Sequence, residues 1–140
     1  MPALCFDPLS SLVRLDPDGA ADRLARGPES WRTINRATGA RVIGMSRPAQ
    51  PADLHPDSWE MHPEGDELLH LLGGAIDLVL DEPDGEQRIR LEGGQSCIVA
   101  RGTWHCLLLR EPSILTFVTP AGGTRMRPRL AHEPSGRKKP

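Results

Sequence analysis

The stretch WEMHPEGDELLHLLGG, residues 59–74, packs acidic and imidazole side chains into eleven positions and then becomes apolar. Glu60 and His62 are two residues apart, so their side chains point the same way if this segment is extended. Alternation also places Glu67 on one face of the strand that follows and His70 on the opposite face. If these faces meet inside the fold, Glu60, His62 and Glu67 would enter a common interior near the start of a strand.

Working outward from this stretch, turn-forming residues recur at regular intervals along the chain. Short apolar runs alternate with breaks rich in Gly, Pro and Asp, and the pair Asp84-Gly85 is a strong hairpin signal. Strands at such spacing favour an all-β fold with an antiparallel sandwich or barrel. The predicted elements are strands at 10–16, 40–46, 67–72, 75–81, 87–91, 96–100, 105–110 and 114–119, a short N-terminal helix within 27–39, and a loop over 47–58.

Length and composition indicate one soluble domain. The chain has 140 residues, of which 38% are hydrophobic and 26% charged. No apolar run approaches the roughly 20 residues needed to span a bilayer, and the N-terminus does not resemble a signal peptide. Three cysteines match no zinc-ribbon spacing, which favours reduced thiols and a cytoplasmic location.

Charge is distributed unevenly along the chain. The segment from Thr124 onward holds six of the seventeen Lys and Arg residues but only one of the nineteen Asp and Glu residues. The remaining acidic body argues against a nucleic-acid partner. We expect an N-terminal extension over 1–39 that packs on a barrel formed by 40–123, followed by a flexible basic tail over 124–140.

A second polar position lies far downstream, in HCLLLR. His105 shares its strand face with two leucines. If this face meets Glu60, His62 and Glu67 inside a barrel, two imidazoles and two carboxylates converge. Such a set suits a divalent transition metal, namely Fe, Mn, Ni or Zn. Without a cation, buried carboxylates would be costly, so convergence would itself argue for a metal.

Two spacings carry a resemblance to a known family. The first is Glu60-x-His62-x4-Glu67-x6-Gly74. It resembles the first motif of the cupins, G-x5-H-x-H-x3,4-E-x6-G, with Glu60 in the position of the first histidine and Leu54 in that of the leading glycine.

The second spacing is Gly94-x5-Ala100-x-Gly102-x2-His105-x3-Leu109. It resembles the second cupin motif, G-x5-P-x-G-x2-H-x3-N, with Ala100 replacing the proline and Leu109 the asparagine. The resemblance covers roughly residues 40–120. It implies a small jelly-roll β-barrel, commonly a homodimer, that binds a metal through Glu60, His62, Glu67 and His105.

Other conspicuous side chains receive more ordinary interpretations. Apolar residues on the inward faces are predicted to form the cavity wall, as in most small-molecule pockets. Glu64 and Asp66 are expected to be solvated turn residues, and His70 to be packed on the outer face. His55 and His132 are expected at the surface. The predicted cavity wall consists of Leu69, Leu71, Leu107 and Leu109.

The sequence leaves the function open between two main alternatives. The first is a metal-dependent enzyme, of the oxygenase or isomerase/lyase type, that acts on a small molecule with Glu60 as a general base. The second is a non-catalytic cupin that binds a small ligand or a metal. A purely structural role agrees least with the polar ligand set. No membrane partner is expected.

Overall fold

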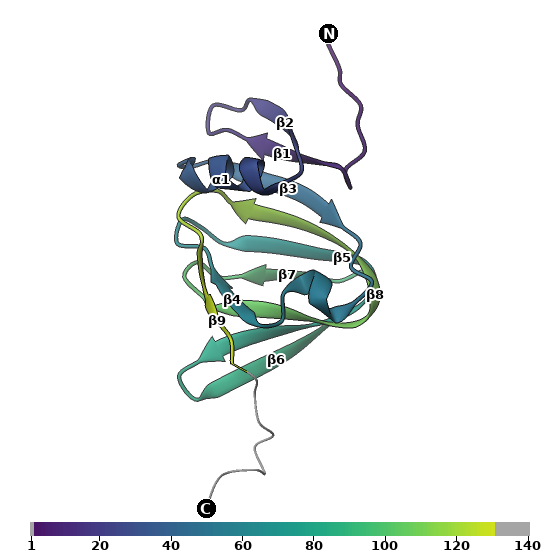
Figure 1. Cartoon of the computed structure of the whole chain (residues 1–140), viewed down its shortest axis with the longest axis vertical. Helices are drawn as coiled ribbons and strands as arrows, with labels where there is room; N and C mark the ends of the chain where they lie inside the picture. The colour runs from purple at the N-terminus through teal and green to yellow at the C-terminus, as the bar shows by residue number, and fades with distance from the viewer. Residues whose placement is uncertain (1, 131–140) are drawn as a thin grey trace, which may run out of the picture.

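The structure, a computed structural model, describes residues 2–130, which form a predominantly antiparallel β-fold (Figure 1). One α-helix, α1 (Pro28–Arg36), and one short 3-10 helix, η1 (Pro51–Leu54), interrupt the strands. The strands are β1 (Ser11–Leu15), β2 (Ala21–Ala25), β3 (Arg41–Ser46), β4 (Ser58–Met61), β5 (Glu67–Glu82), β6 (Gly85–Glu92), β7 (Ser96–Val99), β8 (His105–Pro120) and β9 (Arg125–Pro128).

Two long strands, β5 and β8, form the centre of the sheet. They pair along almost their whole length, from Leu68 opposite Val118 to Leu80 opposite His105. Along its other edge, β5 pairs with β7 in its first part and with β6 in its second part. Along its other edge, β8 pairs with β4 at its first residue and with β3 in its last part. Each long strand therefore belongs to two half-sheets, and a bend in the middle turns the inner faces of these halves toward one another.

The bend coincides with the glycine pair that ends the opening stretch. The register between β5 and β8 shifts repeatedly between Leu71 and Ile76. Gly74 has a φ of +95°, and a Cβ at this position would lie 2.1 Å from Oγ of Ser113 on β8. Only glycine combines this backbone conformation with such a close approach of the neighbouring strand.

The predicted strand breaks at this point are wrong. The expected strands 67–72 and 75–81 are one strand, and so are 105–110 and 114–119. Bulges absorb the turn-forming residues while pairing continues on both sides, so glycine and proline bend the strands here without ending them.

The N-terminal residues extend the sheet and add a helix that packs on it. β1 pairs with β2 across a turn and also with β3, so this hairpin extends the sheet beyond β3 (Figure 1). Ile34 of α1, which lies within the range predicted for a helix, is buried against Leu12 and Val42. The packing places α1 over the open end of the bent sheet.

The expected tail over 124–140 needs correction in its first part. Residues 125–128 form β9, which pairs with β4. Arg129 then bonds both carboxylate oxygens of Glu86, at 2.9 and 3.2 Å, and its guanidinium lies 5.3 Å from the ring centroid of Trp59. Ladder hydrogen bonds and these contacts fix a segment whose charges alone predict a solvated end. Residues 131–140, including His132, lie outside the described residues.

The strand pairing of residues 2–130 follows a branched path and does not close into a ring, so hydrogen bonding does not show the expected closed barrel. The sheet is nevertheless bent around a common interior. Over the same residues, no helix is long and apolar enough to cross a membrane.

Candidate metal centre

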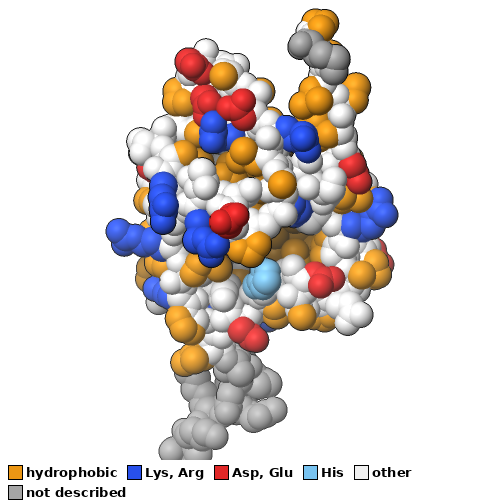
Figure 2. All heavy atoms as spheres, turned by 45° about the horizontal axis from the view of Figure 1, so that its top comes forward, with side chains coloured by type: hydrophobic (Ala, Val, Ile, Leu, Met, Phe, Trp, Pro, Cys, Tyr) orange, Lys and Arg blue, Asp and Glu red, His pale blue; other side chains and the backbone are white. Residues whose placement is uncertain are grey.

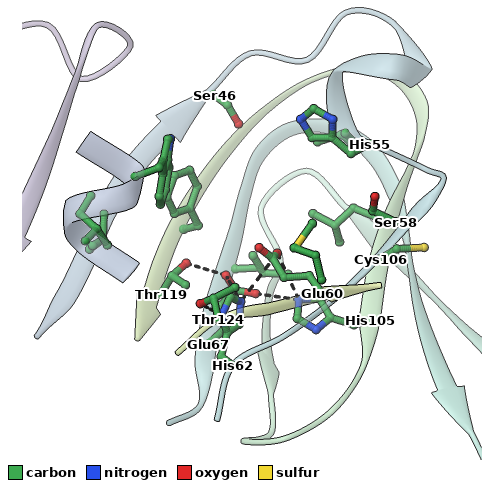
Figure 3. Close-up of a pocket in the computed structure, with 18 of the residues that line it drawn as sticks. Ser46, His55, Ser58, Glu60, His62, Glu67, His105, Cys106, Thr119 and Thr124 are labelled. Carbon is green, nitrogen blue, oxygen red and sulfur yellow. Dashed lines mark hydrogen bonds and ion pairs between the residues drawn. The ribbon is translucent and has the colours of Figure 1, made fainter. Parts of the chain in front are cut away.

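The four predicted ligand residues come together at one end of the bent sheet (Figure 3). Glu60 on β4 lies directly opposite His105, the first residue of β8. His62 follows β4 immediately, and Glu67 is the first residue of β5. Pairing of β4 and β5 with the same strand, β8, is what joins two motifs that are separated in the sequence.

The polar atoms of these side chains lie within a few ångströms of one another. Nε2 of His105 is 3.1 Å from Oε1 of Glu67, and Nε2 of His62 is 3.4 Å from Oε2 of the same carboxylate. Oε1 of Glu60 lies 3.7 Å from Nε2 of His62 and 3.9 Å from Nε2 of His105. Both imidazoles therefore direct Nε2 toward the two carboxylates.

Burial separates the two glutamates. Both histidines and Glu67 are almost fully buried, whereas the Glu60 side chain keeps 40% of its surface exposed. Glu60 thus forms the side of the cluster that faces the cavity, and Glu67 forms its closed side.

Hydrogen bonds fix the orientation of the His105 ring. Its Nδ1–H donates to the Thr103 carbonyl at 3.0 Å, and a carbonyl can only accept. In the neutral ring Nε2 then carries a lone pair, yet it faces a carboxylate of Glu67 that also only accepts. Either a second proton on the ring or a cation between the two groups must resolve this opposition.

His62 also has a ring nitrogen that needs a partner. Its Nε2 is buried and has no hydrogen-bond partner among the described residues. Its Nδ1 lies 2.9 Å from Oγ1 of Thr124, a contact that holds the ring in place. A buried polar atom without a partner is costly, and a bound cation would supply the partner that Nε2 of His62 needs.

The electrostatics of the metal-free cluster follow from burial and these contacts. Burial raises the pKa of Glu60 above its ordinary value. Burial acts the same way on Glu67, but the hydrogen bond with His105 and the nearby imidazole of His62 outweigh it and lower the Glu67 pKa to about 2. For His105, burial lowers the pKa, and the contact with Glu67 overcomes this and raises it. Glu67 is thus held as an anion, whereas Glu60 is the carboxyl group most ready to accept a proton.

The donor set fits a divalent metal. One nitrogen or oxygen atom from each of Glu60, His62 and His105 lies within 4.8 Å of the others. Ligands held at roughly 2.0–2.2 Å from one ion stand about 3 Å or slightly more apart. The separations that involve Glu67 are in this range, but its two oxygens face different histidines and it is not a member of this three-residue group. The separations that involve Glu60 are slightly longer. Thr119 donates to Oε2 of Glu67 at 2.5 Å and supports its orientation.

A cavity of about 680 Å³ opens from the cluster. This volume is typical of small-molecule sites. Of the predicted wall, Leu69 and Leu107 line the cavity. Leu71 and Leu109 do not, because they lie farther along their strands and pack into the main core beyond the cavity. That part of the prediction is wrong.

Several neighbours of the ligands have other roles. His70 bonds Ser96 at 2.6 Å on the opposite face of β5, away from the site, as expected. Glu64 and Asp66 were expected to be merely solvated, but each accepts a backbone N–H, Glu64 from Gly39 and Asp66 from Arg101. These two carboxylates tie the loop between β4 and β5 to its surroundings.

The alternation of strand residues could not place the cavity residues that come from outside the predicted strands. His55, expected at the surface, is exposed but also lines the cavity from the C-terminal side of η1 (Figure 3). Arg26 and Trp31 reach the cavity from the N-terminal extension. The one available signal was a tryptophan in an otherwise polar predicted helix.

Comparison with known proteins gives matches only at the level of structure. No protein-family model matches the sequence, and no curated protein sequence is similar to it. A cupin-2 domain-containing protein from Shewanella frigidimarina is 16% identical, with a TM-score of 0.45 over 57% of this chain and 70% of the other.

Two enzymes are similar over less of their own length. An oxalate oxidase in complex with glycolate is 12% identical, with a TM-score of 0.47 over 61% of this chain and 44% of the other. Hydroxypropylphosphonic acid epoxidase from S. wedmorenis is 19% identical, with a TM-score of 0.44 over 57% of this chain and 42% of the other. The chain thus spans less than half of either enzyme.

Proposed function

We propose that this protein binds a divalent transition metal through His62, His105, Glu67 and Glu60 and acts on a small molecule in the adjacent cavity. The observation that carries the proposal is the pair of buried Nε2 atoms that face carboxylates, one of which has no hydrogen-bond partner. A bound cation would satisfy all of these atoms at once. The bent sheet that surrounds the cavity also supports a barrel of jelly-roll type.

The chemistry that fits best is a metal-dependent reaction of the oxygenase or isomerase/lyase type. A bound metal would supply Lewis acidity or a site for oxygen. Glu67, held by Thr119, would keep both imidazoles in place. Glu60 faces the cavity, and burial raises its pKa, so its carboxylate is placed to accept a proton from a bound substrate.

One observation favours the alternative of ligand binding without turnover. Outside the cluster, the only carboxylate and imidazole among the described cavity residues are Asp53 and His55. Asp53 accepts the backbone N–H groups of Ala49 and Gln50 at 2.9 and 3.0 Å, so it caps η1. Few acid–base groups thus remain for chemistry away from the metal.

Metal analysis of untagged protein tests the metal site. We expect about one equivalent of metal per chain after reconstitution, and at least a tenfold weaker affinity in His105→Asn. His70→Asn is the matched control, because His70 is a histidine on the outer face of β5. Stoichiometric binding that survives in His105→Asn, or no binding by the native chain, would refute the proposal.

A further inference from the structure

Arg26 is a cation without an acidic partner at the wall of the cavity. Its Nη1 donates to the carbonyl of Leu9 at 3.5 Å and to that of Met45. Among residues 2–130, no carboxylate forms an ion pair with it and no hydrogen bond uses its other two guanidinium nitrogens, Nε and Nη2. Burial lowers its pKa, which shows that the surroundings do not compensate the charge.

Apolar and aromatic side chains surround this cation. Its guanidinium carbon lies 6.0 Å from the centre of the Phe117 ring, and Trp31 stacks near the same ring with centroids 6.1 Å apart. Leu54 and Leu115 also line the cavity. Figure 2 shows a hollow with hydrophobic side chains inside it and a histidine at its edge. The cavity therefore combines an apolar wall with the positive charge of Arg26.

Arg26 and the metal cluster lie at different ends of the cavity. Met45, whose carbonyl Arg26 binds, is the register partner of Thr116 on β8. Thr116 is three residues from Thr119, which donates to Glu67. Three strand residues correspond to about 10 Å. Ser46, next to Met45, also lines the cavity on the side away from the cluster (Figure 3).

The charges of the cavity lining also favour an anionic ligand. Its acidic side chains are Asp53, Glu60 and Glu67, and its basic ones are Arg26 and Arg32. A divalent cation would neutralise the two glutamates, and Asp53 is engaged by backbone N–H groups. The loaded cavity would then be net positive, which favours an anionic ligand.

We infer that the cavity takes a small carboxylic acid with an apolar or aromatic body, whose carboxylate binds Arg26 and whose far end reaches the metal cluster. The free Nε and Nη2 of Arg26 match the two oxygens of a carboxylate. The Ser46 hydroxyl can donate to the same group. This inference deepens the proposed function and rests on it for the position of the reacting end only, since Arg26 does not touch the metal ligands.

Paired acids and amides test the inference by calorimetry. The probes are 3-phenylpropanoate against 3-phenylpropanamide and hexanoate against hexanamide, with metal-free and Zn²⁺-loaded protein. We expect at least one acid to bind the native chain tenfold or more tightly than its amide in both forms. Arg26→Met should remove this preference while leaving amide binding unchanged. Arg23→Met, on the exposed face of the same hairpin, should behave like the native chain.

Two further measurements keep the outcome unambiguous. Zn²⁺ affinity of Arg26→Met should equal that of the native chain, which separates loss of the acid site from loss of the metal site. If Arg26→Met does not fold, labelling of native Arg26 by phenylglyoxal should be slowed by the acid and not by the amide. Equal binding of acid and amide, an unchanged preference in folded Arg26→Met, or labelling insensitive to the acid would overturn the inference. A chain that binds no metal yet prefers the acid through Arg26 would refute the proposed function alone.

Discussion

Nδ1 of His62 lies 2.9 Å from Oγ1 of Thr124, so a residue just before β9 orients a predicted metal ligand. The backbone N–H of Thr124 in turn donates to Oδ1 of Asn35 on α1 at 2.8 Å, and the Gly123 N–H donates to the Asn35 carbonyl at 3.0 Å. The N-terminal extension is therefore connected through two contacts to the imidazole at the centre of the site.

This connection predicts that Thr124→Val weakens metal binding without unfolding the protein. Valine keeps the shape of threonine but removes the hydroxyl that holds the His62 ring. Partners of this kind typically contribute 10- to 100-fold to metal affinity. Competition with a chromogenic chelator measures the effect. Thr116→Val, a half-buried position of β8 away from the cluster, is the control. Equal affinities of both variants would contradict the prediction.

Glu60 should decide which metal the site prefers. With two carboxylates, the cluster favours harder ions more than a site with three histidines and one carboxylate would. Glu60→His should therefore lower the affinity for Mn²⁺ relative to Zn²⁺, by tenfold or more, in competition titrations of both metals. Glu64→His, in the nearby loop, should leave the ratio unchanged. A Mn²⁺/Zn²⁺ ratio that is the same in Glu60→His and the native chain would show that Glu60 does not ligate.

Local patterns predicted much of this site because it is built from strand faces. Alternation within 59–74 places Glu60, His62 and Glu67 on common faces, and the second motif supplies His105. The alternation pattern could not show that Gly74 bends a continuous strand, because the close approach of Ser113 depends on how β8 pairs with β5.

The N-terminal contribution escaped prediction for a different reason. Backbone carbonyls of residues distant in sequence hold the Arg26 side chain at the cavity. The residues next to Arg26 in the sequence do not indicate that it lines a site. Residues 125–128 were also missed, because RMRP is only four residues long and lies in a basic, proline-containing segment. Its pairing depends on the exposed edge of β4.

The homodimer remains a prediction, and one outer face of the sheet is the natural place to test it. Leu68 on β5 and Ile98 on β7 are register partners and keep 39% and 69% of their surface exposed. Burial of such a pair against a second copy would remove a sizeable apolar surface from water. We expect a dimer in light scattering, converted to a monomer by Ile98→Asp but not by Ile89→Asp on β6. A native chain that is monomeric at all concentrations would refute this.

Gly44 should be intolerant of any side chain. A Cβ at this position of β3 would lie 2.3 Å from Cζ of Phe117 and 2.8 Å from Cδ2 of Leu12. Overpacking of this kind costs about 1–3 kcal/mol. Gly44→Ala should therefore lower the midpoint of urea unfolding, and it should also disturb ligand binding beside Phe117. Gly73→Ala, where a Cβ meets nothing within 4 Å, is the control. Equal midpoints for the two variants would show that Phe117 has room to move.

The buried carboxylate of Glu67 predicts how the metal-free protein responds to acid. Its pKa is lowered from 4.5 to about 2, since the hydrogen bond with His105 and the nearby imidazole of His62 outweigh the effect of burial. A depressed pKa stabilises the folded state above the unfolded value of 4.5, and this contribution disappears as the pH falls toward 2. The shift corresponds to an upper bound on the order of 3 kcal/mol.

Urea unfolding of chelator-treated protein between pH 5 and pH 2 measures this contribution. The free energy of unfolding should fall steeply in the native chain and much less in Glu67→Gln, which starts less stable because it cannot bear the charge. Glu111→Gln, an exposed position of β8, should follow the native curve. If Glu67→Gln loses stability with acid as steeply as the native chain does, then Glu67 is not the buried anion that holds the two imidazoles in place.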